Sequence, residues 1–425
     1  MFSILKRVIN LLILIIIILM GGYYYFDNHF INTKEYNEDI IKEAVKEINE
    51  DDLIQLEKEI NQEKQPNKEI ETKDEVVFSN NQYYKTFLNE AERKVYYSII
   101  NNSLKHNATF NVSGIKESNL HRIYRAFLND NPEHFWIDNI KYFYNPKNNM
   151  ISKIELLFSI TMNERLERQT AIDNVVNDIL NNVNHYDSHY DKIKYINNYI
   201  VNNTTYDLKA PDNQNIYSVF VNRRSVCAGY ARSFQYLMNK LGIHSIFVTG
   251  KALQQDGEEV GHAWNLVEIN NEYYNIDVTW SNSNFITGEE NNNNYINYHY
   301  FNITDEEILT THLFDSLFSV PESTAVTYNY YVVENLFFNN YNNSTKTRLI
   351  NDFIAKSNFK EKVVSFKFSN RDAYDNAIKQ LFERGDLFYI VREVNKRISN
   401  KIDNSNLKYY LSENKLIIDI IFNYK

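Results

Sequence analysis

The stretch Ser225-Val226-Cys227-Ala228-Gly229-Tyr230-Ala231 contains the only cysteine of this 425-residue chain. Apolar residues recur from Cys227 to Leu241 at the spacing of a helix, which predicts an amphipathic helix that begins close to the thiol. Ser225 is expected to cap the start of this helix and Gly242 to end it. In the first turn, the helix dipole and the free N–H groups favour a thiolate and could also receive an oxyanion.

Two later stretches, Gly261-His262-Ala263-Trp264-Asn265 and Asn275-Ile276-Asp277-Val278-Thr279-Trp280, have the pattern of short strands. The Asn270-Asn271 pair between them suits the positive φ angles of a tight hairpin. A two- or four-residue loop places His262 and Asp277 on the same face, whereas a simple three-residue loop places them on opposite faces. On one face, Asp277 lies opposite Trp264 or opposite His262 itself, within reach of the imidazole.

Cys227, His262 and Asp277 are the residue types of an acyl-transfer site. An imidazolium stabilises a neighbouring thiolate and later protonates the leaving amine, while a carboxylate orients the imidazole. Taken singly, each residue has an ordinary structural explanation, namely a buried thiol, a core histidine or a turn acid. Their joint arrangement favours catalysis. Trp264 and Trp280 are candidates for lining the substrate site and excluding water, although an aromatic residue on a strand face is more often part of the core.

With these motifs in place, the segment from about 190 to 313 resembles the transglutaminase-like core of the papain-like superfamily, and most closely its bacterial, surface-exposed members. The segment 190–207 resembles the approach to the nucleophile, and 300–306 resembles the stretch that follows the aspartate. Asn131-Pro132-Glu133-His134-Phe135-Trp136 resembles the domain that often precedes this core.

The resemblance implies that Cys227 is the nucleophile, His262 the acid/base and Asp277 the orienting acid. It also implies an α+β fold in which the cysteine helix packs on an antiparallel sheet that carries the other two residues. The superfamily includes protein crosslinkers, deamidases, peptidases, amide hydrolases and a few scaffolds that lack the triad, so the resemblance specifies the acyl-enzyme chemistry better than the substrate.

The side chain that would donate to the oxyanion is left open. Tyr217, Gln214 and Asn215 lie just upstream of Cys227 and are candidates, with Tyr217 kept as a substrate-binding residue, although turn or core roles are commoner for each. No acidic cluster has the regular spacing of a calcium loop, so we expect neither an obligatory metal nor a cofactor.

The N-terminus predicts a membrane anchor. Lys6-Arg7 precedes the run 8–20, which is apolar apart from Asn10, and an aromatic segment extends this run to Phe26. We therefore expect residues 1–26 to form a single uncleaved span, with the rest of the chain outside the cytoplasm. The alternative is secretion after signal cleavage, which is disfavoured because no small-x-small site follows the apolar run.

The remaining chain divides into a charged stalk or linker (27–80), a mainly helical N-terminal α+β domain (81–165), the transglutaminase-like core (166–320) and a C-terminal α/β module (321–425). In the C-terminal module, strands are expected at Tyr330–Val333, Val363–Phe368 and Leu416–Phe422. No chemistry is visible in this module, so its expected role is packing or ligand presentation.

The formal net charge of −10 argues against a nucleic-acid partner, and one cysteine cannot form an intramolecular disulfide. The expected function is extracytoplasmic acyl transfer on protein or peptide amide bonds through a thioester. Hydrolase, peptidase or deamidase activity is favoured over crosslinking because water is the default acceptor. The alternatives are a surface binding or scaffold protein that has lost catalysis, and an assembly factor that acts on one cell-envelope partner protein.

Overall fold

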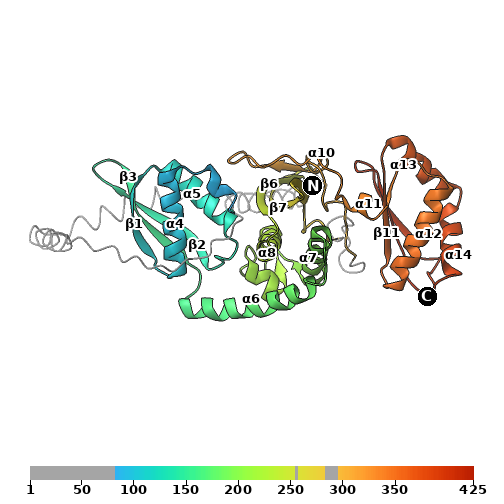
Figure 1. The fold of residues 1–425 in the computed structure, drawn as a ribbon, viewed down its shortest axis with the longest axis horizontal. Coiled ribbons are helices and arrows are strands. Elements are labelled where there is room, and N and C mark those ends of the chain that lie inside the picture. The colour runs from blue at the N-terminus through green and yellow to red at the C-terminus, as the bar shows by residue number, and fades with distance from the viewer. Residues whose placement is uncertain (1–81, 254–256, 283–294) are drawn as a thin grey trace, which may run out of the picture. The chain divides into compact units, whose positions relative to one another are not determined.

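The computed structural model describes residues 82–253, 257–282 and 295–425 (Figure 1). The predicted anchor (1–26) and stalk (27–80) lie outside these residues. Within the described ranges, no helix is both long enough and apolar enough to cross a bilayer.

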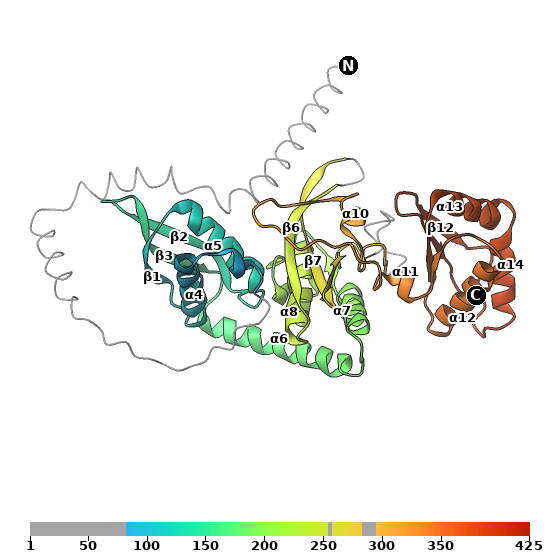
Figure 2. The same ribbon diagram turned by 45° about the horizontal axis from the view of Figure 1, so that its top comes forward.

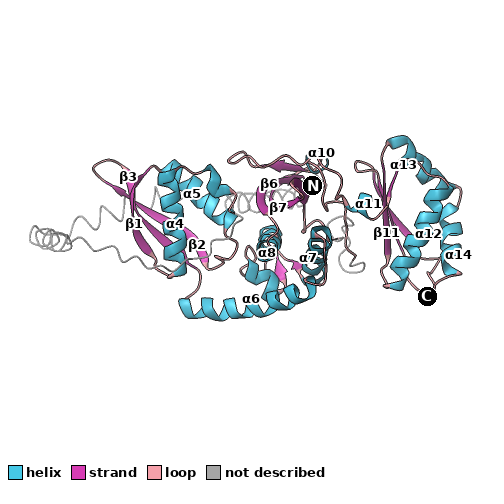
Figure 3. Cartoon of the chain, in the orientation of Figure 1, coloured by secondary structure: helices cyan, strands magenta, loops and turns pink. Residues whose placement is uncertain are grey.

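The first described segment is α+β, with two α-helices beside an antiparallel sheet in the order β1-β3-β2 (Figure 3). Its elements are η1 (Tyr84–Phe87), α4 (Glu90–Leu104), β1 (Thr109–Ile115), α5 (Glu117–Asp130), β2 (Ile137–Asn145) and β3 (Met150–Phe158). Helix α4 begins at a capping box formed by Asn89 and Glu92. Strands β2 and β3 form a hairpin and β1 pairs with β3, so the segment contains more sheet than the expected mainly helical domain.

The middle segment places the cysteine helix against an antiparallel sheet in the order β8-β7-β6-β9 (Figure 2). Its helices and short strands are α6 (Met162–Val183), α7 (His189–Asn203), β4 (Thr205–Tyr206), the π-helical turn η2 (Ser218–Asn222), β5 (Arg224–Ser225), α8 (Cys227–Lys240) and α10 (Asp305–Ile308). The sheet contains β6 (Ser245–Leu253), β7 (Glu259–Ile269), β8 (Glu272–Ile276) and β9 (His312–Phe314). Phe234 and Leu237 on α8 are buried in the same apolar core as Val267 on β7. This is the arrangement that the resemblance implied.

The β7–β8 hairpin has the two-residue loop that the sequence predicted. Ile269 pairs with Glu272, and the intervening Asn270 and Asn271 have φ angles of 54° and 65°. Both values lie in the left-handed region that such a loop requires. Continuing this register beyond Ile276 puts Asp277 opposite Trp264, on the face that also carries His262.

The start of α8 differs from the expectation in one respect. The residue that precedes the helix is Val226, and no side chain caps the first turn. Instead, the Ser225 hydroxyl donates to the carbonyl of Asn213 at 2.8 Å. The first-turn N–H groups of α8 are therefore not occupied by a side-chain cap. At the other end, Gly242 follows the helix with a φ of 69°, as predicted.

The C-terminal module has a sheet in the order β10-β11-β13-β12 and three longer helices. Its elements are α11 (Tyr330–Val333), β10 (Phe337–Phe338), α12 (Asn343–Asn358), β11 (Val363–Phe368), α13 (Arg371–Ile378), the π-helical turn η3 (Lys379–Glu383), α14 (Asp386–Asn395), β12 (Lys408–Ser412) and β13 (Ile417–Ile421). The expected strand at Tyr330–Val333 is wrong. These residues form a helical turn because the Asn329 side chain caps it by accepting from the N–H of Tyr331.

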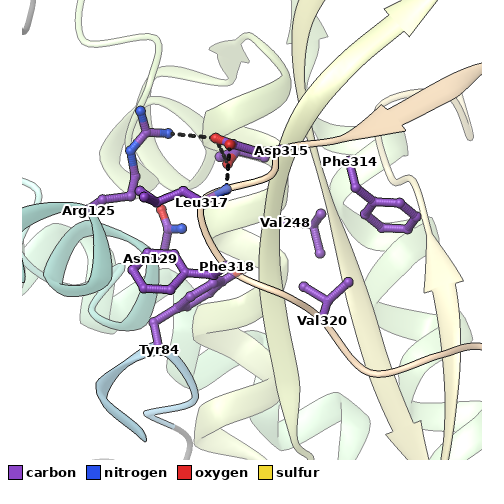
Figure 4. Close-up of a pocket in the computed structure, with 10 residues that line it drawn as sticks. Tyr84, Arg125, Asn129, Val248, Phe314, Asp315, Leu317, Phe318 and Val320 are labelled. Atoms are coloured by element: carbon purple, nitrogen blue, oxygen red, sulfur yellow. Dashed lines mark hydrogen bonds and ion pairs between the residues drawn. The ribbon is translucent and has the colours of Figure 1, made fainter. Parts of the chain in front are cut away.

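Polar contacts join the first segment to the middle one. Arg125 on α5 lies 3.6 Å from the Asp315 carboxylate, which also accepts from the N–H of Leu317 (Figure 4). The Tyr84 hydroxyl donates to the carbonyl of Phe247 on β6 at 2.7 Å. The cavity at this seam measures only about 10 Å³, room for at most one water molecule.

Candidate active site

Cys227 is the first residue of α8 and is 8% exposed. Its side chain lies near His262 and helps to raise the pKa of that imidazole, which projects from β7 and is 5% exposed. The His262 Nε2 lies 2.7 Å from Oδ2 of Asp277, so Nδ1 is the ring atom left to face the thiol. The structure thus brings together the three residues that the sequence singled out, in the order thiol, imidazole, carboxylate.

Asp277 is fully buried just beyond β8, and both of its oxygens are occupied. Oδ1 accepts from the backbone N–H groups of Thr279 at 2.9 Å and Trp280 at 3.1 Å. Oδ2 faces Nε2 of His262 and, at 3.2 Å, Nε2 of a second histidine, His312. A carboxylate with this many donors is held in one orientation, which in turn fixes the imidazole plane of His262.

His312 is a site residue that the sequence analysis missed. It is fully buried on β9, and its Nδ1 lies 2.9 Å from the Thr311 hydroxyl. It reaches Asp277 past Gly250, a β6 residue paired with both His262 and Phe314. A Cβ at Gly250 would lie 2.0 Å from the carbonyl oxygen of Leu313, so β9 can approach only because this residue is glycine.

The electrostatics of the site favour an ion pair between Asp277 and His262. Burial lowers the pKa of His262, but the charge and hydrogen bond of Asp277 outweigh it and raise the pKa to about 10. Burial likewise raises the pKa of Asp277, and His262 and His312 together hold it below its ordinary value. Burial is the main cause that lowers the pKa of His312. The bond to Asp277 raises this pKa, but the positive charges of His262 and Lys415 offset part of that rise.

Tyr206 is the second residue that the sequence analysis did not single out. It lies on β4, where it pairs with Ser225, two residues before Cys227. Burial raises the pKa of its phenol, and the nearby Cys227 and Asp277 raise it further. The phenol therefore stays protonated and can serve as a donor close to the thiol.

The proposed wall residues lie around the imidazole. The Trp264 ring stacks on His262 with centroids 6.2 Å apart, is fully buried, and donates through Nε1 to Asn275. The half-buried Trp280 lies 5.8 Å from His262 and 4.8 Å from His312. Contact of either tryptophan with substrate stays a prediction.

The upstream candidates for the oxyanion site make local contacts. The Arg168 guanidinium lies 4.6 Å above the Tyr217 ring, and the Asn215 carboxamide accepts from the N–H of Tyr217. Gln214 is exposed. A Cβ at Gly229 would lie 2.0 Å from Oγ of Ser225, so this glycine permits tight packing at the start of α8.

The nitrogen and oxygen atoms of His262, Asp277 and His312 lie within 4.8 Å of one another, a spacing that a metal ion could also use. However, Nε2 of each histidine already faces the same carboxylate oxygen at hydrogen-bond distance. These three side chains therefore fit a carboxylate that accepts hydrogen bonds from two histidines better than they fit a metal centre.

The sequence profile of the transglutaminase-like superfamily matches residues 177–278. No curated protein matches the chain. Similar solved structures include a TGase (20% identity, TM-score 0.25), which aligns over 37% of this chain and 46% of its own. A candidate cysteine protease from Cytophaga hutchinsonii has 14% identity and a TM-score of 0.23 over 34% of this chain and 62% of its own. The periplasmic domain of TgpA from Pseudomonas aeruginosa has 16% identity and a TM-score of 0.23 over 33% and 57%.

This chain spans less than two thirds of each of those structures. The profile match is more specific in position, because it begins in α6 and ends one residue after Asp277. Residues 177–278 of this chain, which match the transglutaminase-like superfamily, carry Cys227, His262 and Asp277.

Proposed function

We propose that this protein is a cysteine-dependent acyl-transfer enzyme that acts on amide bonds of proteins or peptides. The observation that carries the proposal is the buried chain of contacts from Cys227 through His262 to Asp277, with Nε2 and Oδ2 2.7 Å apart. Such a chain lowers the cost of forming a thiolate–imidazolium pair in a site with little access to water.

The reaction begins when the Cys227 thiolate attacks the carbonyl carbon of the amide. Oxyanion donors are the uncapped N–H groups at the start of α8 and the phenol of Tyr206. His262 then gives its proton to the leaving nitrogen, the C–N bond breaks, and a thioester to Cys227 remains. In the second half, His262 takes a proton from water and the hydroxide attacks the thioester. The C–S bond then breaks, the carboxylic acid leaves, and the proton on His262 returns to the sulfur.

Hydrolysis is the preferred outcome, as a peptidase or deamidase. A crosslinker uses the same thioester but delivers it to a lysine amine, which requires that amine to reach the acyl-enzyme before water does. The apolar N-terminal segment (1–26) supports placing the reaction outside the cytoplasm on a membrane-anchored protein, and secretion after cleavage is the alternative. A cell-envelope protein is then the natural substrate or partner.

The first test is the pH dependence of alkylation by iodoacetamide in the full-length protein. Cys227 is the only cysteine, so every labelled molecule reports this site. We expect the wild-type rate to rise well below the free-thiol pKa of about 8.5, and His262→Ala to move this rise back toward that value. The exposed His185 provides a matched control, and His185→Ala should leave the profile unchanged.

Asp277→Asn provides a second arm of the same experiment. An amide cannot stabilise the imidazolium, so kcat on an amide substrate should fall by about 10³- to 10⁴-fold while the protein still folds. A Cys227 thiol that titrates like a free thiol and is indifferent to His262 would overturn the proposal. That result would favour a binding protein that keeps the fold without the chemistry.

A further inference from the structure

Lys415 is a buried lysine in the turn between β12 and β13 of the C-terminal module. It is only 6% exposed, although lysine is rarely buried without a partner. Its ammonium lies 4.1 Å from the centroid of the Tyr300 ring and donates to the carbonyl of Glu307 at 3.2 Å. Burying a charge is costly, so we ask what structural role this buried ammonium has over the Tyr300 ring.

Tyr300 connects this lysine to the candidate active site. The backbone N–H of Asp277 donates to the carbonyl of Tyr300 at 3.0 Å. The Tyr300 ring meets Trp280 edge to face at 4.9 Å and lies 5.6 Å from His312. Any movement of Tyr300 would therefore displace the backbone of Asp277 and the rings packed around it.

Other contacts of the C-terminal module reach the same stretch of chain. His299 lies 2.9 Å from the carboxylate of Asp419 on β13, and both side chains are buried. Lys367 on β11 forms an ion pair with Glu307. The module thus holds Tyr300 in two ways. Asp419 binds His299, the residue before Tyr300, and the Lys415 ammonium lies over the Tyr300 ring.

The charge of Lys415 also acts on His312. The titratable and polar groups that face His312 are the Asp277 carboxylate, the His262 imidazole, the Tyr300 phenol, the Thr311 hydroxyl and the Lys415 ammonium. Burial lowers the pKa of Lys415 to about 8, against the opposing charge of Glu307, while Lys367 lowers it further. Below that value Lys415 is cationic and favours the neutral form of His312, which then donates to Asp277 without competing with the imidazolium of His262.

We propose that Lys415 is a positioning residue of the catalytic centre, through which the C-terminal module holds Tyr300 and, through it, the Asp277–His312 pair that orients His262. This proposal rests on the proposed function and extends it, because it makes a module without visible chemistry part of the catalytic arrangement. It also predicts that undocking the module weakens the reactivity of Cys227.

The test is Lys415→Met in the full-length protein, which keeps much of the side-chain volume and removes the charge. Without that charge, protonation of His312 should begin at higher pH and draw Asp277 away from His262. We expect alkylation of Cys227 at about pH 6 to slow by roughly tenfold, the equivalent of a shift of about one pKa unit in the acid limb. Lys415→Arg should restore most of the wild-type profile, and Lys362→Met, which removes an exposed lysine of the same module, should leave it unchanged.

A double-mutant cycle tests whether the effect passes through His312. In a His312→Gln background the added Lys415→Met change should shift the acid limb no further, because no group remains there to titrate. A pH profile that Lys415→Met leaves unmoved, or that shifts equally with and without His312, would overturn the proposal. If His262→Ala leaves the alkylation profile of Cys227 unchanged, the proposed function itself fails. That outcome is distinct from failure of the Lys415 proposal alone, in which His262→Ala shifts the profile and Lys415→Met does not.

Discussion

At His262, burial and the Asp277 carboxylate act on the imidazole pKa in opposite directions, and the carboxylate prevails. The folded pKa is raised from 6.5 to about 10, so this pair should stabilise the fold fully below pH 6.5 and progressively less as the pH rises through about 10. Urea unfolding of the wild type and of His262→Gln at about pH 6 and pH 10 measures this. The difference in unfolding free energy between the two proteins should shrink at the higher pH. A difference that stays constant would mean that His262 is neutral in the folded state.

Tyr206→Phe removes a single hydroxyl beside Cys227. If the phenol donates to the oxyanion, kcat for amide hydrolysis should fall by about a hundredfold, as for other single oxyanion donors. The alkylation profile of Cys227 should change little, because iodoacetamide reacts without a tetrahedral intermediate. Equal losses in both assays would instead indicate that Tyr206 shapes the thiol environment.

The sequence predicted Cys227, His262 and Asp277 because each lies in a recognisable local pattern. His312 has no such pattern. It occurs in the three-residue strand β9, which pairs with β6 although the two strands lie far apart in the sequence. Lys415 could not be predicted either, since a lysine in a turn is normally exposed and only the folded structure buries this one.

At the scale of elements, Gly250 decides how closely β9 can lie against β6. A methyl group there would meet the carbonyl of Leu313 at 2.0 Å and the indole of Trp264 at 2.9 Å, so neither neighbour can yield without moving backbone or a buried ring. We expect Gly250→Ala to lower the unfolding free energy by about 3 kcal/mol, the upper range for overpacking. Gly114→Ala is the matched control on β1, because its Cβ would meet only the Met150 side chain, whose Cβ lies 3.1 Å away rather than 2.0 Å. Equal effects in urea unfolding would contradict the role of Gly250.

The elements that the sequence predicted well are those with a local determinant. The Asn270-Asn271 loop fixed the register of β7 and β8, because asparagine tolerates the positive φ angles of a two-residue turn. The prediction for Tyr330–Val333 was wrong because strand propensity, a weak preference, was overridden by the Asn329 cap and by burial of both tyrosines. Ser225 was likewise assigned to the helix cap, whereas it binds the loop carbonyl of Asn213.

At the scale of the whole molecule, the C-terminal module makes contacts with the segment beside the candidate active site that the sequence did not predict. The sequence locates its β11 and β13 strands, but gives no sign that Asp419 and Lys415 contact the segment beside the candidate active site. Such contacts join residues more than a hundred positions apart, and no local pattern encodes them. Local sequence patterns therefore locate strands of the C-terminal module but not its contacts with the segment beside the candidate active site.

The placement of the chain beyond residue 26 outside the cytoplasm is a further prediction, which a substituted cysteine can test. Phe359 is 79% exposed on the C-terminal module, and in a Cys227→Ser background Phe359→Cys would provide the only thiol. If residues 1–26 form an anchor with its basic end in the cytoplasm, a membrane-impermeant maleimide should label intact and lysed cells equally. Ser3→Cys in the same background is the control and should be labelled only after lysis. Label confined to lysed cells for Phe359→Cys would place the body in the cytoplasm, whereas labelled protein in the medium would indicate a cleaved signal.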